Sequence, residues 1–354
     1  MADESTCAPL TRASVFNAHE LIKSRIHNTP VLTSRFLNQL ASKEQVGSQR
    51  PAKPVLRLWF KCENLQRIGA FKARGAFHAI EKLKQEPGWL ENDGAKKGVV
   101  CFSAGNHAQA VALAARESQI TAHIVMPETS SPVKIQSVRG YGANLTLCGR
   151  FEREACAAEI MAKTGARLIS PFDHPDVILG QGTAALELQD EVKELNAIVS
   201  PCSGGGLLAG TALSCEGTGI RVYGAEPEFE GADDGRRGFL SGERITHVDS
   251  NTIADGLIGK LGALPWEIIY ERRLVDMMYA VTEENILDAM KLIFERLKLV
   301  VEPAAAVPLA VVLYNEEFRG MVEREAGETG WDVGIILSGG NVGVGRISDL
   351  FAQN

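Results

Sequence analysis

The sequence predicts an α/β protein in which two mainly parallel sheets are flanked by helices. From about residue 95 onward, short apolar stretches alternate with segments of helical periodicity. This alternation is typical of parallel strands that are covered by helices on both faces. The stretches fall into two blocks, and a chain of 354 residues is long enough for two domains. We therefore expect two α/β domains with a cleft between them.

The domain boundaries follow from the positions of the two blocks. Residues 96–175 are expected to form a small, mobile α/β domain. Residues 1–95 and 176–354 lie on both sides of it in the sequence and are expected to form one large domain together.

The first part of the chain combines helices, a loop and a strand. Apolar residues at helical spacing predict an amphipathic helix over 11–27 and a further helix over 71–84. Residues 41–54 are polar and contain two prolines, which indicates an exposed loop. An apolar stretch at 55–63 predicts a strand.

The rest of the chain supplies the two blocks of strands. The first block has expected strands at 97–103, 121–127, 143–149 and 166–171, with helices at 107–118, 132–140 and 152–164. The later expected strands are 197–203, 221–227, 277–281 and 333–341.

Composition narrows the class of protein and its location. The net charge is −7, and no basic stripe of the kind that nucleic-acid-binding proteins need is visible. The seven cysteines are odd in number and form no C-x-x-C pair, which argues for a reducing compartment and against a disulfide framework or a thiolate metal site. The first 30 residues lack an apolar signal core, and no run of about 18 apolar residues is present. We expect a cytoplasmic protein without a membrane span.

A glycine-rich turn is the clearest binding motif. Gly204, Gly205 and Gly206 follow an expected strand and precede an apolar helix. Glycines allow backbone N–H groups to approach an anion, and a helix N-terminus favours negative charge, so we predict a phosphate site. The same turn fits the loose dinucleotide fingerprint, with Glu226 placed for a ribose contact. An NAD-dependent oxidoreductase is therefore an alternative at this point.

Lys72 is the candidate nucleophile. It lies among small and apolar residues between a glycine-containing turn and a predicted helix. Desolvation would lower the pKa of its amine, and a lysine so placed suits a Schiff base with pyridoxal phosphate. The neighbouring Arg74 would lower that pKa further if it were close to the amine, although a solvated Arg74 is an equal alternative.

Two further turns carry polar groups. In the first, Ser103 and Asn106 can donate hydrogen bonds, and the following helix begins near His107. Ser103 could equally be the N-cap of that helix. In the second, Ser338 ends an apolar strand and could face a ring nitrogen. Glu302 lies in an apolar setting, where a carboxylate is costly unless it is paired or functional.

Seven motifs together resemble those of fold-type II pyridoxal-phosphate enzymes, in the branch of eukaryotic serine racemase and the serine/threonine dehydratases, including threo-3-hydroxyaspartate dehydratase. They are "GAFKARGA", "FSAGNHAQAVA", "GQGTAALEL", "GGGLLAG", "TIADG", "VVEPAAA" and "LSGGNV". The resemblance extends from about residue 15 to about residue 347. It implies pyridoxal 5'-phosphate as the cofactor, held by the large domain, a small amino acid as the substrate and a homodimer. It also places the nicotinamide alternative well behind.

The resemblance assigns roles to individual residues. It makes Lys72 the covalent anchor of the cofactor and the catalytic base. The residues that it implies for cofactor binding are Phe71, Lys72, Asn106, Gly204, Gly205, Gly206, Leu207, Glu302 and Ser338. Those that it implies for substrate binding are Ser103, Ala104, Asn106, His107 and Arg153. The family's phosphate loop usually has four glycines, and here Ser203 occupies the first position.

The resemblance also implies a divalent cation beside the phosphate loop. Its ligands would be Glu226, the carbonyl of Ala232 and Asp234. Oxygen ligands suit Mg²⁺, and Ca²⁺ or Mn²⁺ are alternatives. The spacing between the two acids is two residues longer than the family pattern.

Position 104 separates two reactions within the family. The racemases have a serine there, which returns a proton to the face opposite the lysine, whereas serine and threonine dehydratases resemble this chain in having alanine. Ala104 has no proton to give, and acid–base catalysis contributes about 10²–10⁴-fold. We therefore predict β-elimination of L-serine, L-threonine or threo-3-hydroxyaspartate to a keto acid and ammonia, with racemisation as the alternative. Arg153 would favour an acidic substrate, while Gly259 replaces a small hydroxyl residue.

Overall fold

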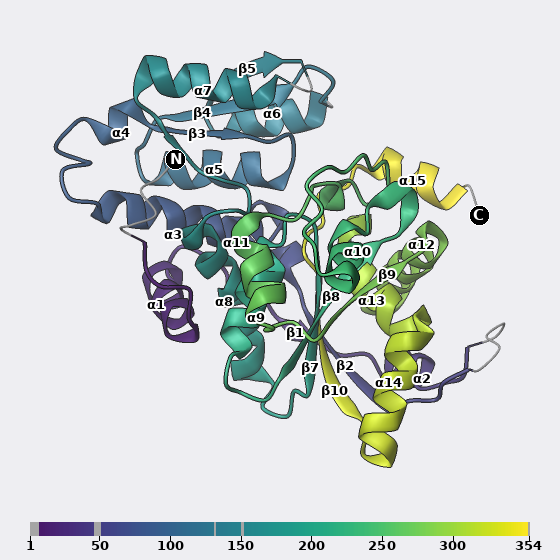
Figure 1. The fold of residues 1–354 in the computed structure, drawn as a ribbon. Coiled ribbons are helices and arrows are strands. Elements are labelled where there is room, and N and C mark those ends of the chain that lie inside the picture. Colours follow the sequence, from purple (N-terminus) through teal and green to yellow (C-terminus); the bar gives the residue numbers. More distant parts are fainter. Residues whose placement is uncertain (1–6, 46–50, 131, 150–151, 353–354) are drawn as a thin grey trace.

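The computed structural model describes residues 7–45, 51–130, 132–149 and 152–352 and shows an α/β protein with two mainly parallel sheets (Figure 1). The larger sheet has the strand order β1-β2-β10-β7-β8-β9. Its strands are β1 (Val31–Leu32), β2 (Leu56–Lys61), β7 (Ala197–Pro201), β8 (Arg221–Pro227), β9 (Met277–Val281) and β10 (Trp331–Ile336). All neighbouring pairs are parallel except β1 and β2, which are antiparallel.

The smaller sheet has four parallel strands in the order β5-β4-β3-β6. They are β3 (Val99–Phe102), β4 (Ala122–Pro127), β5 (Asn144–Cys148) and β6 (Arg167–Leu168). The helices that follow its strands are α5 (Asn106–Glu117), α6 (Pro132–Gly140) and α7 (Arg153–Thr164). This sheet lies entirely within the segment 96–175 that was predicted as the small domain.

Most of the remaining helices surround the larger sheet. The full set of remaining helices is α1 (Arg12–Ile22), α2 (Arg35–Ala41), α3 (Lys72–Gln85), α4 (Gly94–Lys97), α8 (Pro175–Glu191), α9 (Gly206–Cys215), α10 (Asp234–Ser241), α11 (Ala263–Trp266), α12 (Glu283–Leu292), α13 (Pro303–Tyr314), α14 (Glu316–Ala326) and α15 (Val344–Ala352). Short 3₁₀ turns occur at Glu63–Leu65, Arg67–Gly69, Phe229–Gly231, Asp255–Leu257 and Gly327–Thr329. Single π-turns extend two of the helices at Glu267–Glu271 and Ile293–Leu297.

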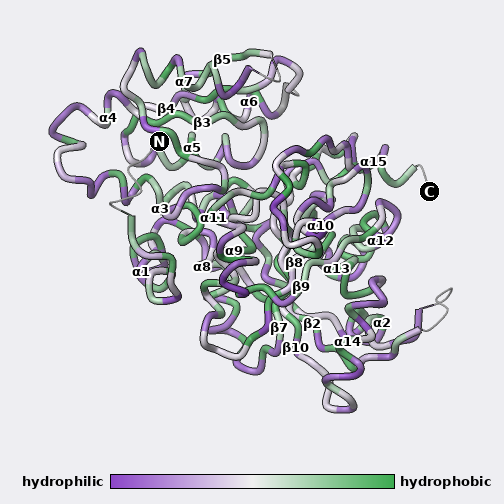
Figure 2. The backbone as a smooth tube through the Cα atoms, viewed as in Figure 1, coloured by the Kyte–Doolittle hydropathy of each residue, from purple (hydrophilic) through white to green (hydrophobic). Residues whose placement is uncertain are grey.

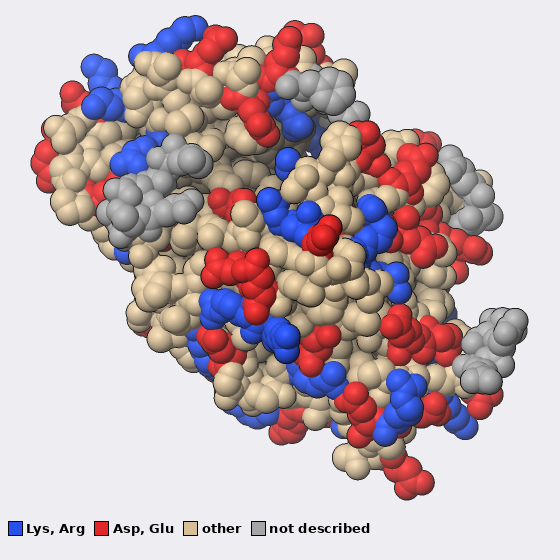
Figure 3. All heavy atoms as spheres, in the orientation of Figure 1, with Lys and Arg blue, Asp and Glu red and all other residues tan. Residues whose placement is uncertain are grey.

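The larger sheet is buried on both faces, which explains why its strands read as continuous apolar stretches. Consecutive residues point to opposite faces, so Val199 packs in the core formed with α12 and α13, whereas Ile198 packs in the core formed with α8 and α9. Figure 2 shows hydrophobic stretches along both sheets and hydrophilic stretches in the peripheral loops. On the face drawn in Figure 3, acidic and basic side chains are interspersed.

Helix α3 links the two sheets. Its apolar residues Phe77 and Ile80 share a core with Val99 of β3 and Val111 of α5, while other residues of α3 contact α8. The helix precedes the predicted domain boundary at residue 96 but packs against the smaller sheet. Because it begins at Lys72, it places that residue where the two sheets face one another.

The predicted strands are all present, and the helices predicted at 71–84, 107–118, 132–140 and 152–164 match their observed counterparts to within one residue at each end. The sequence analysis did not anticipate β1 or α2, which lie between the first helix and the predicted loop. In the part of the chain that the structure describes, no helix is long and apolar enough to cross a membrane.

Candidate active site

A cavity of about 340 Å³ lies where the carboxyl ends of strands from both sheets face one another. This volume is within the range of about 300–1,000 Å³ that is usual for small-molecule sites. Every residue that the sequence analysis assigned to the cofactor or the substrate lines this cavity. They are Phe71, Lys72, Ser103, Ala104, Asn106, His107, Arg153, Gly204, Gly205, Gly206, Leu207, Glu302 and Ser338.

The N-terminus of α9 forms one wall and is suited to an anion. No side chain caps this helix, and its first internal bond runs from the Ala209 N–H to the Gly205 carbonyl at 2.8 Å. The N–H groups before Ala209 are therefore not used by the helix itself. Gly205 has a φ of 86°, which favours glycine, and a Cβ on Gly204 would lie 2.2 Å from the Phe172 ring. Both the turn and its close packing thus require glycine.

Lys72 extends into the cavity from the first residue of α3. Its amine donates a hydrogen bond to the Pro171 carbonyl and lies 5.1 Å from the centroid of the Phe71 ring. Desolvation lowers the pKa of the Lys72 amine to about 8. A considerable fraction of this amine is neutral near physiological pH, and the neutral form is the nucleophile and base.

Arg74 does not act on Lys72 in the way that the sequence analysis suggested, and it is not solvated. Its guanidinium is fully buried and forms hydrogen bonds with both carboxylate oxygens of Glu63 and both of Glu187, at 2.7–2.8 Å. Burial alone would lower the pKa of Arg74, but these two carboxylates raise it overall. Both earlier alternatives for Arg74 were wrong, because its charge is compensated inside the protein.

The turn after β3 holds Asn106 in a fixed orientation. Asn106 donates from Nδ2 to Glu302 Oε1 at 2.8 Å and accepts at Oδ1 from Asn341 Nδ2 at 2.8 Å. Asn341 in turn donates to the Ile68 carbonyl. The sequence analysis did not single out Asn341, although it lies in the quoted "LSGGNV" motif. One amide hydrogen of Asn106 remains for a ligand.

Ser103 is not the N-cap of α5. The cap residue is Gly105, which has no side chain to offer, and the Ser103 hydroxyl instead accepts a hydrogen bond from the Gly105 N–H at 3.3 Å. The hydroxyl stabilises the turn two residues before the helix. Its proton is not consumed by that bond and can be donated in the cavity.

His107 is a neutral imidazole held against the smaller sheet. It is buried, and its Nε2 lies 2.9 Å from the Ile169 carbonyl, so Nε2 carries the proton. Burial, with a further contribution from the Lys72 charge, lowers the pKa of His107 to about 3. Its Nδ1 has no hydrogen-bond partner among the described residues. An unpaired acceptor in a cavity wall is suited to a ligand donor.

Glu302, which bonds to Asn106, and Ser338 also line the cavity. Glu302 is buried, and desolvation raises its pKa to about 7. The Ser338 carbonyl accepts a hydrogen bond from the Phe71 N–H at 3.0 Å, which connects the end of β10 to the residue before Lys72. Ser338 itself is buried in the wall, where its hydroxyl can meet a neutral or basic ring atom.

Ser203 and Gly259, two positions that depart from the family pattern, are in direct contact. The Gly259 N–H donates to Ser203 Oγ at 3.0 Å, and this hydroxyl donates to the Gly259 carbonyl at 3.2 Å. A Cβ on residue 259 would lie 3.1 Å from the same oxygen. A side chain at position 259 would therefore be in tight contact with the hydroxyl at position 203.

Charged residues from two helices and a turn also line the cavity. Arg153 lines it from the first residue of α7, as the sequence analysis expected. Lys134 of α6 and Asp255 also line the cavity. Their ion pair, at 3.0 Å, connects a helix beside the smaller sheet to the 3₁₀ turn at Asp255–Leu257. Neither was anticipated, because an isolated lysine in a helix and an aspartate in a loop carry no distinctive pattern.

Glu226 and Asp234 lie behind the phosphate-loop segment and are both buried. Glu226 accepts hydrogen bonds from the Gly235 and Arg236 N–H groups, and Asp234 accepts one from the Leu261 N–H. Burial first, and then the neighbouring Asp234, raises the pKa of Glu226 well above its usual range. Two buried acids that repel one another are an environment in which a cation is favourable. Ala232, whose carbonyl is the remaining expected ligand, is also buried and lies two residues before Asp234 in the sequence.

The residues of the cavity fit pyridoxal phosphate. An uncapped helix N-terminus can accept the phosphate, a desolvated lysine can bond to the aldehyde, and fixed amide and hydroxyl groups can meet the ring substituents. The nicotinamide alternative is not supported, because Glu226 is completely buried and bonded to the backbone rather than available to a ribose. Fold and site together define a fold-type II pyridoxal-phosphate enzyme.

Comparison with known proteins agrees with this class. The model of the family "Pyridoxal-phosphate dependent enzyme" matches residues 22–339, and the chain belongs to this family. A serine racemase of Dictyostelium discoideum is 41% identical over 97% of this chain and 98% of its own length. The L-threo-3-hydroxyaspartate ammonia-lyase of Saccharomyces cerevisiae is also 41% identical, over 97% of this chain and 96% of its own.

Solved structures give the same result. The crystal structure of the Dictyostelium serine racemase superimposes with a TM-score of 0.82 and covers 94% of this chain and 99% of that chain. The protein is therefore a member of the serine racemase, hydroxyaspartate dehydratase and threonine deaminase group. The relatives are divided between racemases and dehydratases, so they do not decide between the two reactions.

Proposed function

We propose that this protein catalyses the β-elimination of a small β-hydroxy amino acid to a keto acid and ammonia. The observation that carries this proposal is the methyl group of Ala104 in the cavity wall. Ala104 lies beside Ser103 in the turn that lines the same cavity as Lys72, and it offers no proton. Without an acid at this position, racemisation lacks the second proton-transfer group that it needs.

Lys72 is the residue that moves the proton. When bound, pyridoxal phosphate stabilises the negative charge that develops at the substrate Cα. The amine of Lys72, whose pKa desolvation lowers to about 8, removes the Cα proton, and the resulting ammonium gives this proton to the β-hydroxyl, which leaves as water. The unsaturated product then hydrolyses to the keto acid and ammonia, which balances the reaction without an oxidant.

The remaining polar groups of the turn hold the substrate. Ser103 and the free amide hydrogen of Asn106 are donors on one side of the cavity and can bind the α-carboxylate. The N-terminus of α5, which has no side-chain cap, adds favourable charge for the same group. Glu302 and Asn341 keep Asn106 in position and so reduce the entropy that binding costs.

The cavity also favours a substrate with a second acidic group. Arg153 and Lys134 both line it, and a guanidinium is suited to bidentate binding of a carboxylate. Threo-3-hydroxyaspartate is therefore a candidate substrate besides L-serine and L-threonine. We further propose that Mg²⁺, Ca²⁺ or Mn²⁺ binds at Glu226 and Asp234 and stabilises the segment behind the phosphate loop.

Two assays on the purified holoenzyme test this proposal. Keto-acid release from L-serine, L-threonine and threo-3-hydroxyaspartate identifies the substrate, and Arg153→Met should reduce kcat/KM for the acidic substrate more than for L-serine. Chiral analysis of residual L-serine measures racemisation. We expect keto acid without appreciable D-serine, and rapid D-serine formation would establish the racemase instead.

A gain-of-function variant tests the role of position 104. Ala104→Ser places a hydroxyl at the same point of the wall, and we expect it to raise D-serine formation relative to elimination. Ala104→Val adds volume without a proton and serves as the control. Equal racemisation by both variants would contradict the assignment.

A further inference from the structure

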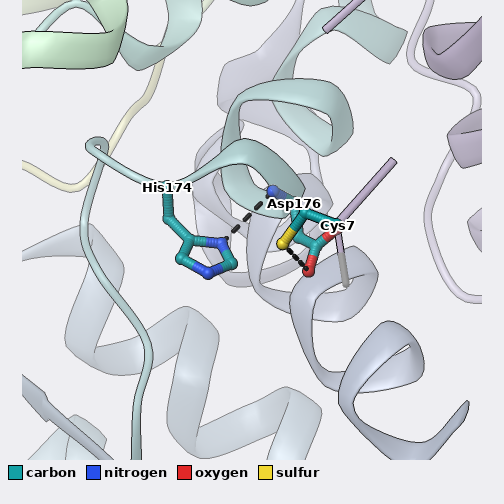
Figure 4. Close-up of side chains that lie close together, drawn as sticks. All are labelled: Cys7, His174 and Asp176. Atoms are coloured by element: carbon teal, nitrogen blue, oxygen red, sulfur yellow. Dashed lines mark hydrogen bonds between the residues drawn. The ribbon is translucent and has the colours of Figure 1, made fainter. Parts of the chain in front are cut away.

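Three side chains of metal-binding type converge away from the cavity (Figure 4). Cys7 comes from the segment before α1, whereas His174 and Asp176 lie at the beginning of α8. Within the described residues, they are the one group of three cysteine, histidine or carboxylate side chains whose ligand atoms all lie within 4.8 Å of one another. Nothing in the proposed reaction uses them.

The thiol and the carboxylate already have a separation that suits a shared ion. Cys7 Sγ lies 3.5 Å from Asp176 Oδ2. A tetrahedral zinc ion with bonds of about 2.3 Å to sulfur and about 2.0 Å to oxygen would hold these atoms about 3.5 Å apart. His174 needs a small movement toward the other two to complete the set, because the group as a whole spans up to 4.8 Å.

Two polar atoms of this group are left without partners. His174 and Asp176 are 8% and 7% exposed, and neither His174 Nε2 nor Asp176 Oδ1 has a hydrogen-bond partner. An unsatisfied buried polar group lowers the stability of the folded state. A cation bound through Asp176 Oδ2 would compensate the charge of an acid that is buried beside a thiol and an imidazole.

We propose that Cys7, His174 and Asp176 bind one divalent transition-metal ion of the zinc type. The Cys7 thiol releases its proton to solvent on binding, and its hydrogen bond to Asp176 is replaced by two bonds to the ion. His174 Nδ1 now accepts the Asp176 N–H at 3.2 Å as the N-cap of α8, and coordination exchanges that bond for a bond to the metal. Water completes the four positions.

This site differs in chemistry from the pair of acids behind the phosphate loop. Sulfur and imidazole ligands select zinc and similar ions, whereas carboxylates alone suit Mg²⁺. Binding would fix the segment before α1 to the point where the chain passes from the smaller sheet into α8. The site differs from the expectation that the chain holds no thiolate metal site, which rested on the absence of a C-x-x-C pair, because Cys7 and Asp176 are 169 residues apart and form no local pattern.

Cobalt binding to the holoenzyme tests the proposal. The protein is first stripped of transition metals and then titrated with Co²⁺ in excess Mg²⁺, which occupies sites made of oxygen ligands alone. We expect one equivalent of Co²⁺ with the intense visible bands of a tetrahedral thiolate complex, and displacement of that ion by Zn²⁺. The spectrum is read at wavelengths beyond the cofactor band.

Matched variants locate the ion. Cys7→Ser and Asp176→Asn should weaken binding by at least about 100-fold, and His174→Asn should do so while keeping an N-cap acceptor for α8. Cys156→Ser removes the other partly exposed cysteine and should change nothing. Zinc should also raise the melting temperature of the wild type and of Cys156→Ser, but not that of Cys7→Ser. Failure of the wild type to bind, or equal binding by Cys7→Ser, would overturn the site.

Discussion

Lys72 and Arg74 lie two residues apart at the start of α3, but their charged groups are in opposite electrostatic environments. Arg74 is completely buried between Glu63 and Glu187, and its charge is matched by theirs. Lys72 faces the cavity, where its amine bonds to the Pro171 carbonyl and forms no salt bridge with any described residue. The pKa of Arg74 is therefore raised, whereas desolvation lowers that of Lys72 to about 8.

This difference distinguishes groups that hold the fold from groups that are available for chemistry. A buried ion pair is strongly destabilising to break, because removal of one partner leaves the other charged and desolvated. A desolvated group without a counter-ion lowers stability but has a pKa nearer to the working pH. Glu302 resembles Lys72 in this respect, since desolvation raises its pKa to about 7. His107 differs, because desolvation lowers its pKa to about 3 and keeps the imidazole neutral at the working pH.

The largest effect is expected from Lys72→Ala. Loss of the base should reduce turnover by at least about 10³-fold, and the visible cofactor band that borohydride abolishes in the wild type should be absent. The free energy of unfolding of the apoprotein should change little, because the lost amine had no ion pair. Lys84→Ala, on the same helix and paired with Glu81, is the control and should retain full activity. Substantial turnover by Lys72→Ala would refute its role.

Arg74→Met should have the opposite profile. It leaves Glu63 and Glu187 buried with less compensation, and we expect the free energy of unfolding to fall by about 3–5 kcal/mol in urea denaturation. Lys163→Met breaks an exposed pair with Glu159 and should cost no more than about 0.5 kcal/mol. If both variants lost equal stability, the buried network would not have the role inferred for it.

Glu302 gives a pH dependence of defined sign. Its folded pKa of about 7 lies above the usual value of 4.5, so the folded apoprotein binds this proton more tightly than the unfolded chain does. Stability should therefore fall as pH rises from about 4.5 to 7 and should change no further above pH 7 from this group. The shift corresponds to about 3 kcal/mol.

Glu302→Gln isolates that contribution. The amide keeps an oxygen that accepts from Asn106 but does not ionise. Relative to the wild type, the variant should gain stability between pH 5 and pH 8, as measured by urea denaturation of the apoprotein at each pH. A constant difference across this range would show that Glu302 does not titrate there.

The fold could be predicted from the sequence because buried parallel strands have a strong local pattern. Residues 277–281 are a continuous apolar stretch and residues 121–127 are mostly apolar, and both became strands that are covered on their faces. The pair β1 and α2 was missed because a two-residue strand is too short to show a period and is defined only by its pairing with β2. A local sequence pattern cannot predict an element that forms only by pairing with another segment of the chain.

The site was predictable for a different reason, since its residues lie in short motifs at the ends of strands. Motifs brought Ser103, Asn106 and Ser338 into the prediction, and the structure places all three in one cavity. They did not reveal what each residue contacts. The pairing of Arg74 with two acids and the bond between Asn106 and Asn341 depend on segments that are far apart in the chain.

The smallest predicted effect concerns Ser203 and Gly259. Unlike Arg74 and its two acids, these residues are neutral, and we expect that a hydroxyl at either position can connect the two segments. Ser203→Gly removes the hydroxyl that bonds to the Gly259 N–H and carbonyl, and we expect a loss of about 1 kcal/mol and a several-fold weaker affinity for pyridoxal phosphate. Gly259→Ser should weaken this connection in the wild type, because its Cβ would lie 3.1 Å from Ser203 Oγ and would displace that hydroxyl from its two bonds to residue 259. In the Ser203→Gly background this tight contact is absent, and a hydroxyl at 259 can take over the connection. The double variant should therefore bind the cofactor better than either single variant, as measured by equilibrium titration of the apoprotein. Strictly additive losses would show that the two positions are independent.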